Sequence, residues 1–419
     1  MIDARTGAPP PRDGALTKGR PVWALGMMTG TSMDGLDAAL LKTDGETIET
    51  FGPGWEAQAW PATGAALVDA LAEIAKLRTG DLRSVDTWPG WLCNLRDQVT
   101  DHHAWAMDGF QRDTTFAGHG DVWSHGGDTA LGLPIGIHGQ TVLHRPDEHF
   151  TLQLFAPERL RTEVRHATVV SDFRAGDLGN GGQGAPLAPF YHFALAKWIG
   201  ATEPIAFLNL GGVANVTWVD PSKAGPDDHG ALIAFDTGPA NALIDDWMRA
   251  QTGAPFDRDG EAARSGTVRT QRLSSNSGAE YLSRKEPKSL DRNDFHGVLA
   301  AMEGLSAEDG AATLTAFTAE CVAAGAAHLP SAPARWLVCG GGRRNPTLMQ
   351  MLRAKLASPV ETVEAVGLDG DLLEAQAFAY LAIRVLRGLP TSAPGTTGCS
   401  EPVCGGRITP LGGENGQRA

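Results

Sequence analysis

Short apolar runs that end in small-residue turns recur along the chain, and each run predicts a β-strand. Residues 22–30 form the first run and lead into the turn Thr-Gly-Thr-Ser-Met-Asp-Gly. The apolar pattern resumes over 37–43 and stops at Asp44-Gly45, a pair typical of hairpins. The plan returns over 205–219, where two apolar stretches flank Gly211-Gly212. We therefore predict strand, turn and strand at both places, and the shared plan suggests an internal duplication.

Apolar residues at helical spacing predict helices in several longer segments, which lie at 62–80, 157–165, 240–251, 311–328, 346–356 and 374–386. Short strands are predicted at 169–170 and 336–339. Residues 101–132 are rich in His, Gly, Trp and Asp and show no clear period, so we predict a loop or an irregular insertion there. Strands and helices interleave in both halves, which is typical of an α/β protein with two lobes.

The length of 419 residues favours two or three domains. We expect a disordered extension over 1–21, an N-terminal lobe over 22–203 and a C-terminal lobe over 204–419. An apolar content of 42% excludes global disorder. No apolar run approaches the roughly 18 residues that a membrane helix needs. A net charge of −14 without basic runs argues against a nucleic-acid partner, because binding phosphates needs clustered Lys and Arg.

Cysteine and histidine usage sets the expected compartment and excludes common metal sites. The five cysteines are scattered and include no CxxC pair, which is typical of a reducing compartment and excludes the common structural zinc sites. The first residues have three consecutive prolines but no apolar segment, so they do not resemble a secretory signal. Histidines around 102–125 fit no zinc-ligand spacing. We therefore expect a cytoplasmic protein.

Four small-residue turns are candidate phosphate sites. Turns at 29–35, 211–215 and 236–241 follow apolar strands, and 340–342 precedes a helix. Successive backbone N–H groups in such turns can hold phosphate oxygens, although any one of them alone is ordinary hairpin chemistry. None is a Walker loop or a GxGxxG loop. Oxygen-bearing side chains in them suit a magnesium nucleotide, and these are Thr29, Thr31, Ser32, Asp34, Asp37, Asp236 and Thr237.

An opening motif and eight later ones, in one order, resemble those of the anhydro-N-acetylmuramic acid kinases. The opening motif is GMMTGTSMDGLDAAL from Gly26. The later motifs are HGQT (138), DFRAGD (172), GGQGAPL (181), NLGGVAN (209), FDTGPAN (235), FDRDG (256), CGGG (339) and EAQAFA (374). The resemblance implies an actin/hexokinase-like fold, α/β in class, with two lobes that are each built on a ribonuclease-H-like mixed sheet.

The resemblance also implies the reaction. Its substrates are ATP and 1,6-anhydro-N-acetylmuramic acid, and water opens the anhydro bridge while O6 is phosphorylated. The products are N-acetylmuramate 6-phosphate and ADP, in peptidoglycan recycling and amino-sugar catabolism. The family is homodimeric and uses Mg²⁺.

The catalytic base that the resemblance assigns is Asp236. A carboxylate there would take a proton from the attacking water, although Asp236 could also be only a turn-former before Gly238-Pro239. Asp172 and Asp177 compete for the role of base, and their structural alternative is to anchor Arg174 or to cap a helix.

The resemblance places the other ligand contacts in the same motifs. Residues expected to bind ATP are Thr29, Gly30, Thr31, Ser32, Met33, Asp34, Gly35, Asp37, Gly211, Gly212, Asn215, Gly340, Gly341 and Gly342, with Asp34 as a Mg²⁺ contact through water. Residues expected to bind the sugar are His138, Gln140, Thr141, Asp172, Arg174, Asp177, Gln183 and Glu374. His138, Gln140 and Thr141 would meet sugar hydroxyls, and Arg174 would bind the lactyl carboxylate. Their structural alternatives are a satisfied histidine at 138 and a helix-dipole partner at Glu374.

Two rival functions stay open. The first is a kinase of an ordinary hexose or an alkyl carboxylate on the same fold, although HGQT and GGQGAPL do not belong to those families. The second is a non-catalytic ATP-switched protein of the actin or heat-shock type, which predicts no sugar-stimulated turnover.

Overall fold

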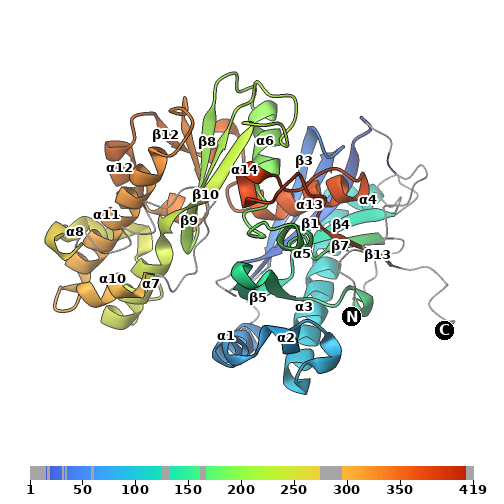
Figure 1. Cartoon of the computed structure of the whole chain (residues 1–419), viewed down its shortest axis with the longest axis horizontal. Coiled ribbons are helices and arrows are strands. Elements are labelled where there is room, and N and C mark those ends of the chain that lie inside the picture. The colour runs from blue at the N-terminus through green and yellow to red at the C-terminus, as the bar shows by residue number, and fades with distance from the viewer. Residues whose placement is uncertain are drawn as a thin grey trace. The chain divides into compact units, whose positions relative to one another are not determined.

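The chain forms two compact units in a computed structural model, which describes residues 16, 19–30, 33, 35–57, 61–124, 132–160, 167–273 and 295–411. Unit 1 comprises Met1–Trp198 together with Leu372–Ala419, and unit 2 comprises Ile199–Asp371 (Figure 1). The prediction of one lobe over 204–419 is therefore wrong for its last part, because the helix that follows Asp371 packs on the sheet of unit 1. The extension predicted over 1–21 lies mostly outside the described residues.

Unit 1 is built on a six-stranded sheet in the order β13-β7-β4-β1-β2-β3. Strands β1, β2 and β3 form an antiparallel meander, β4 is parallel to β1, and β7 is parallel to β4. Strand β13 pairs antiparallel with β7. The strands are β1 (Val22–Thr29), β2 (Leu36–Thr43), β3 (Ile48–Ala57), β4 (Leu133–Ile137), β7 (Ala167–Ser171) and β13 (Arg407–Leu411), with a separate hairpin of β5 (Gln140–Arg145) and β6 (Phe150–Leu154).

Helices cover both faces of this sheet. The helices of unit 1 are α1 (Pro61–Lys76), α2 (Thr79–Leu82), α3 (Gly90–Thr114), α4 (Gly120–Ser124), α5 (Ala175–Gly179), α6 (Pro189–Trp198), α13 (Leu373–Leu386) and α14 (Pro394–Thr397). Apolar residues of α3 and α4 pack on one face in a single core cluster with Leu25 and Met27 of β1. Because neighbouring residues of a strand point to opposite faces, Gly26 faces α13 on the other side.

The long helix α3 overturns the prediction of an irregular segment over 101–132. Val99, His103, Ala106 and Phe110 are all buried and recur at intervals of four, three and four residues, which is one face of a helix. A histidine in the buried stripe hides this periodicity, because His103 is polar by type yet fully buried, with Nδ1 2.7 Å from the Val99 carbonyl oxygen. Residues 125–131 lie outside the described part of the chain.

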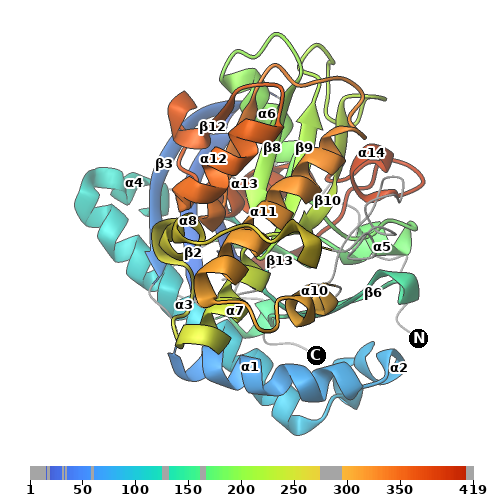
Figure 2. The same cartoon turned by 90° about the vertical axis from the view of Figure 1, so that its left-hand side faces the viewer.

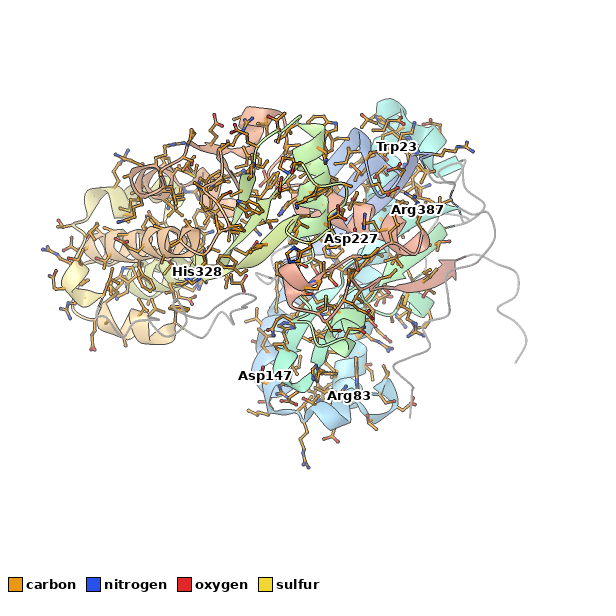
Figure 3. All side chains as sticks on the ribbon, turned by 45° about the horizontal axis from the view of Figure 1, so that its top comes forward. Trp23, Arg83, Asp147, Asp227, His328 and Arg387 are labelled. Atoms are coloured by element: carbon orange, nitrogen blue, oxygen red, sulfur yellow. The ribbon has the colours of Figure 1, made fainter. Side chains whose placement is uncertain are left out.

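The end of α13 is tied to the β2–β3 turn. Arg387, labelled in Figure 3, donates to the Asp44 carbonyl oxygen and to Glu46 at 3.0 Å. Arg384 is 2% exposed and donates to the Gly45 carbonyl oxygen at 2.8 Å. These contacts join the last turn of the helix to a hairpin that precedes it by more than 300 residues.

Unit 2 is built on a five-stranded sheet in the order β10-β9-β8-β11-β12. Its strands are β8 (Ile205–Leu210), β9 (Val213–Val219), β10 (Leu232–Pro239), β11 (Trp336–Cys339) and β12 (Val360–Thr362). Its helices are α7 (Asn241–Thr252), α8 (Glu261–Ser265), α10 (His296–Ala301), α11 (Ala307–Ala326) and α12 (Pro346–Lys355). Helices α11 and α12 lie on the sheet, and their apolar residues share its core cluster (Figure 2).

The two units repeat one topology. In each, three antiparallel strands form a meander, and two further strands pair parallel beyond the first. Strands β1 and β2 therefore correspond to β8 and β9, as the sequence plan suggested. This order, 3-2-1-4-5, is that of a ribonuclease-H-like sheet, so the predicted α/β architecture of two lobes built on mixed sheets is confirmed.

Two local predictions are wrong. The described part of the helix predicted over 157–165 is one 3-10 turn, Pro157–Arg159, after which Leu160 is extended. The turn predicted over 236–241 is strand as far as Pro239, because β10 continues its pairing with β9 beyond an irregularity between Asp236 and Gly238.

Candidate functional site

Three parallel strands of unit 1 end side by side, and candidate residues follow each of them. Thr29 ends β1, His138 follows β4 and Asp172 follows β7. The register pairs Gly26 with Gly136 and Gly136 with Val170, so the three ends lie at one edge of the sheet. In open α/β sheets, ligands bind outside the carboxyl ends of the strands. The structure thus brings together three residues that are separated by more than 100 positions in the chain.

His138 is held by Arg174. The Arg174 Nε donates to His138 Nε2 at 3.1 Å, and Arg174 Nη1 donates to the Gly184 carbonyl oxygen at 3.2 Å. Burial, followed by the Arg174 charge, holds the pKa of His138 well below its usual range. Because a guanidinium only donates, Nε2 accepts, and the neutral ring carries its proton on Nδ1. His138 is therefore suited to hydrogen bonding rather than to proton transfer.

Gln140 and Thr29 join the first turn to the second. Gln140 Nε2 donates to the Gly30 carbonyl oxygen at 3.2 Å, and Thr29 Oγ1 donates to the Gly139 carbonyl oxygen at 3.1 Å. Gln140 is fully buried, and its Oε1 has no hydrogen-bond partner among the described residues. A buried acceptor left unpaired is costly, so a ligand hydroxyl would stabilise it. Thr141 Oγ1 accepts from Gln153 Nε2 at 3.2 Å.

Asp172 has an unusual backbone and a perturbed carboxyl group. Its φ of 54° lies in the left-handed region, which L-residues adopt at a cost. Crowding by surrounding protein raises the pKa of Asp172 to about 6, against an opposing effect of the Arg407 charge. Its carboxyl also accepts from the Ala175 backbone N–H, at the first residue of α5. The helix-capping alternative is thus supported, and the raised pKa leaves a role in proton transfer open.

This pKa predicts a pH-dependent effect of Asp172→Asn on stability. The folded pKa lies above the ordinary value of 3.8, so the folded state binds the proton more tightly and loses stability as pH rises through about 6. Asparagine keeps the capping oxygen but removes the charge. We expect the variant to raise Tm by a few degrees at most at pH 7.5, because the residue is partly exposed to solvent. Thermal unfolding at pH 4 and 7.5 tests this, and an equal shift at both values would contradict it.

The remaining sugar candidates of unit 1 divide into buried and exposed residues. Asp177 is fully buried, and its carboxylate accepts from Ser392, Thr397 and the Gly184 backbone, so it organises a loop rather than meeting a ligand. The Gln183 backbone N–H donates to the Thr397 carbonyl oxygen at 2.7 Å. Glu374 is exposed in the first turn of α13, one helical turn before Phe378. The Phe378 ring lies 4.9 Å from the His138 ring between centroids.

Part of the first turn lies outside the described residues, namely Thr31, Ser32 and Asp34, the last being the predicted metal contact. Of the rest, Met33 has a φ of 58°, and its backbone N–H donates to the Gly30 carbonyl oxygen at 3.2 Å. Asp37 is half-buried on β2, directly opposite Met28. Gly35 is half-buried just before β2.

A row of polar residues crosses the sheet of unit 2. Asp236 on β10 is paired with Asn215 on β9, Asn215 with Asn209 on β8, and Asn209 with Cys339 on β11. Directly paired residues point to the same face, so these side chains are neighbours. Asp236 is half-buried within the strand. The turn-former alternative for Asp236 is therefore wrong.

The glycine turns of unit 2 lie at the end of this row. Gly340 has a φ of 72°, and a Cβ there would lie 2.2 Å from Asn209 Oδ1, so only glycine fits. A Cβ on Gly342 would lie 2.6 Å from the Leu210 Cβ. Gly341 meets only Asn241 Nδ2, at 3.9 Å. The Gly340–342 turn is thus packed directly against the end of β8.

Asn241 is a residue that sequence reasoning missed as a contact, although it ends the FDTGPAN motif. Its Nδ2 donates to the Leu210 and Gly211 carbonyl oxygens, both at 2.9 Å. Its backbone N–H also donates to the Gly211 carbonyl oxygen, at 3.0 Å, and the Ala240 N–H donates to that of Gly212 at the same distance. The start of α7 therefore clamps the Gly211-Gly212 turn next to Asp236.

Arg343 was also missed, and it braces the Gly340–342 turn from behind. It is 8% exposed and donates to the Gly340 carbonyl oxygen at 3.1 Å. It also donates to Glu364 at 2.7 Å and, through two nitrogens, to Asp371 at 2.9 and 2.8 Å. A Cβ on Gly370 would lie 2.4 Å from the Arg343 Nε, so the chain passes close to the guanidinium.

Arg343 and Arg344 form a matched pair for a test. Arg343→Ala leaves two carboxylates without their main partner, and we expect it to lower unfolding free energy by about 2–4 kcal/mol and to raise the KM for ATP. Arg344→Ala removes an exposed contact to the same Asp371 and is expected to cost less than about 1 kcal/mol. Thermal unfolding and ATP titration measure both. Equal effects of the two variants would contradict the bracing role.

Other features of the described residues bear on ligands. They contain no cluster of three or more His, Cys, Asp or Glu that would hold a metal ion on its own. All five cysteines are free thiols. Within the described part of the chain, no helix has the length and apolar character to cross a membrane.

Comparison with known proteins identifies the family. The family model of anhydro-N-acetylmuramic acid kinase matches residues 22–411. A protein of that name from Roseobacter denitrificans is 47% identical over 398 residues, which are 95% of this chain and 97% of the relative. Another from Ruegeria sp. is 48% identical over 396 residues, covering 94% and 96%.

Likeness to solved structures is weak. The activator of 2-hydroxyisocaproyl-CoA dehydratase from Clostridium difficile aligns at a TM-score of 0.37 and 10% identity, over 87% of this chain and 96% of that one. This value carries no argument, so the family rests on the sequence match over nearly the whole chain. The chain belongs to the anhydro-N-acetylmuramic acid kinase family and is a kinase that uses ATP.

Proposed function

We propose that the protein uses ATP and water to convert 1,6-anhydro-N-acetylmuramic acid into N-acetylmuramate 6-phosphate and ADP. Family membership supports the substrate. The structural observation that carries the proposal is the polar row of unit 2, in which Asp236 lies on the strand next to a clamped Gly-Gly turn. A carboxylate beside backbone N–H donors provides a base and a phosphate site close together.

In the proposed reaction, Asp236 takes a proton from water, and the water oxygen bonds to C1. The C1–O6 bond breaks, and its electron pair stays on O6. O6 then bonds to the γ-phosphorus as the bond from that phosphorus to the ADP oxygen breaks. The water oxygen becomes the new C1 hydroxyl, and Asp236 releases its proton to solvent. General-base assistance of this kind contributes about 10²–10⁴-fold.

Asp172 is the runner-up base. With a pKa of about 6, its carboxyl is ionised at neutral pH and close enough to that pH to transfer protons well. We favour Asp236, since Asp172 already accepts the Ala175 N–H as a helix cap. Asp177 is a poor candidate, because its buried carboxylate is fully engaged with donors of its own loop.

We propose that the glycine turns hold the phosphates and the adenosine side. The first turn, Thr29 to Asp37, would meet the β- and γ-phosphates, Gly211-Gly212 with Asn215 would form the second phosphate loop, and Gly340–342 would face adenosine. Mg²⁺ needs only one or two carboxylates beside phosphate oxygens, and the half-buried Asp37 fits that requirement, with Asp34 acting through water. When bound, Mg²⁺ would offset the phosphate charge.

We propose that the edge residues of unit 1 bind the sugar. His138, as a neutral ring, and Gln140, with its unpaired buried oxygen, would hydrogen-bond to sugar groups, with Thr141 beside them. Arg174 would bind the lactyl carboxylate, and its held orientation supports this role. Glu374 is exposed and one turn from the ring that packs on His138, which supports a contact there.

Three further features of the proposal rest on the family or on residue usage. We propose a role in peptidoglycan recycling and amino-sugar catabolism, and a homodimer. We also propose a cytoplasmic location, which the five free thiols support.

Labelled water tests the proposed reaction. In H₂¹⁸O with ATP and the anhydro sugar, we expect one ¹⁸O at the anomeric position of freshly formed product, trapped before anomeric exchange, and none in the phosphate. N-acetylglucosamine serves as the control acceptor and is expected to release no ADP above background. ADP release with N-acetylglucosamine alone would favour the ordinary hexose kinase, and no sugar-stimulated ADP release would favour an ATP switch. Product without label at C1 would overturn the water step.

A further inference from the structure

The Asp177 carboxylate is enclosed by donors from two distant parts of unit 1. Its Oδ1 accepts from Ser392 Oγ at 2.5 Å and from Thr397 Oγ1 at 2.6 Å. Its Oδ2 accepts from the Gly184 backbone N–H at 2.7 Å. Charge-assisted hydrogen bonds of this length are strong, and the carboxylate is fully buried. Its position is therefore fixed by the C-terminal segment as much as by its own loop.

Gly184 passes this position on to Arg174. Its N–H is held by Asp177, and its carbonyl oxygen accepts from Arg174 Nη1 at 3.2 Å. Gly184 has a φ of 71°, and a Cβ there would lie 3.0 Å from the Leu178 Cγ, so the residue has little freedom to move. The same guanidinium donates through Nε to His138. A continuous line of hydrogen bonds thus runs from Thr397 to His138.

The loop between Asp177 and Gly184 is closed around the carboxylate. A Cβ on Gly182 would lie 2.1 Å from Asp177 Oδ2, so only glycine allows this approach. The Gly182 N–H donates to the Asp177 carbonyl oxygen at 3.0 Å, and the Gln183 N–H donates to that of Thr397 at 2.7 Å. The glycines of the GGQGAPL motif therefore serve to wrap Asp177, and none of these contacts involves a ligand.

We propose that Asp177, held by Ser392 and Thr397, is a positioning residue that orients Arg174 and thereby sets the preference for a sugar that carries a carboxylate. The inference rests on the proposed function, in which Arg174 binds the lactyl carboxylate. Guanidinium binding to a carboxylate is strong only in a fixed planar geometry. A loss of orientation should therefore weaken carboxylated ligands and spare those without the carboxylate.

A matched pair at Thr397 tests the proposal. Thr397→Val removes the hydroxyl with little change of shape, and Thr397→Ser keeps it. The readout is the ratio of two dissociation constants, for 1,6-anhydro-N-acetylglucosamine and for 1,6-anhydro-N-acetylmuramic acid, measured by calorimetry. We expect Thr397→Val to lower this ratio about tenfold and Thr397→Ser to leave it near that of the wild type.

Two further variants separate the possible outcomes. Asn180→Ala, which removes a 2.7 Å surface bond to the Gly176 carbonyl oxygen in the same loop, is the control and should keep the ratio. Arg174→Ala should abolish the preference. If it does so while Thr397→Val does not, the positioning role is overturned and the Arg174 contact stands. If Arg174→Ala keeps the ratio, that contact in the proposed function fails, and the inference fails with it. A fall in affinity for both sugars alike would mean a merely structural role.

Discussion

Asp236→Asn is expected to lower kcat by about 10²–10⁴-fold while the fold and ATP affinity stay intact. Asparagine has nearly the same shape, and it would extend a row that already holds Asn209 and Asn215 at paired positions. The sheet should therefore tolerate the change. What is lost is the proton acceptor for water. ADP release gives kcat, calorimetry gives the ATP dissociation constant, and thermal unfolding checks the fold.

The contrast with Asp172→Asn makes this result decisive between the two candidate bases. If Asp236 is the base, Asp172→Asn keeps most of the turnover. If Asp172 is the base, its loss abolishes turnover, and wild-type kcat falls at acid pH with a midpoint near its pKa of about 6. Near-normal turnover in Asp236→Asn would contradict the assignment to Asp236.

The strands and turns of both units were predictable because their signals are local. A run such as 22–30 followed by small residues carries its own strand and its own turn, and β1 ends within one residue of the prediction. The same holds for the pair of β8 and β9 around Gly211-Gly212. The repeated topology was predictable in plan for the same reason, because each meander is formed from consecutive strands.

The positions of residues across the sheets were not predictable from local patterns. Cys339 and Asn209 are paired across parallel strands separated by some 130 residues of chain, and no periodicity reports that register. The bracing role of Arg343 has the same cause, since Asp371 lies 28 residues away. Asp177 misled the prediction because its acidic type suits a ligand contact, while the donors that bury it come from Ser392 and Thr397.

The assignment of the last segment failed for a related reason. Helix α13 follows unit 2 in the chain, yet it packs on β1 and β4 of unit 1. What allows this are two glycines, Gly26 and Gly136, which the register places side by side on adjacent strands. Each glycine looked like a weak point of a strand, and their meaning depends on a partner helix that begins more than 230 residues later.

Gly136→Ala is expected to destabilise unit 1 severely. A Cβ there would lie 2.0 Å from the Phe378 carbonyl oxygen and 2.7 Å from its carbonyl carbon. Both are backbone atoms of α13, so no side-chain rotation relieves the overlap, and the helix must move off the sheet. Gly26 meets the same helix, with a Cβ 1.8 Å from the Ala375 carbonyl oxygen. We expect a loss of about 4 kcal/mol and a fall in Tm on the order of 10 °C.

Gly90→Ala is the matched control, because a Cβ at the first residue of α3 meets nothing within 4 Å and alanine favours a helix. Its Tm should stay unchanged or rise slightly. The displaced helix in Gly136→Ala would also move Phe378, whose ring packs on His138, and Glu374 one turn before it. The variant should therefore lose affinity for the anhydro sugar even below its Tm. A Gly136→Ala protein as stable as the wild type would mean that α13 does not rest on these two glycines.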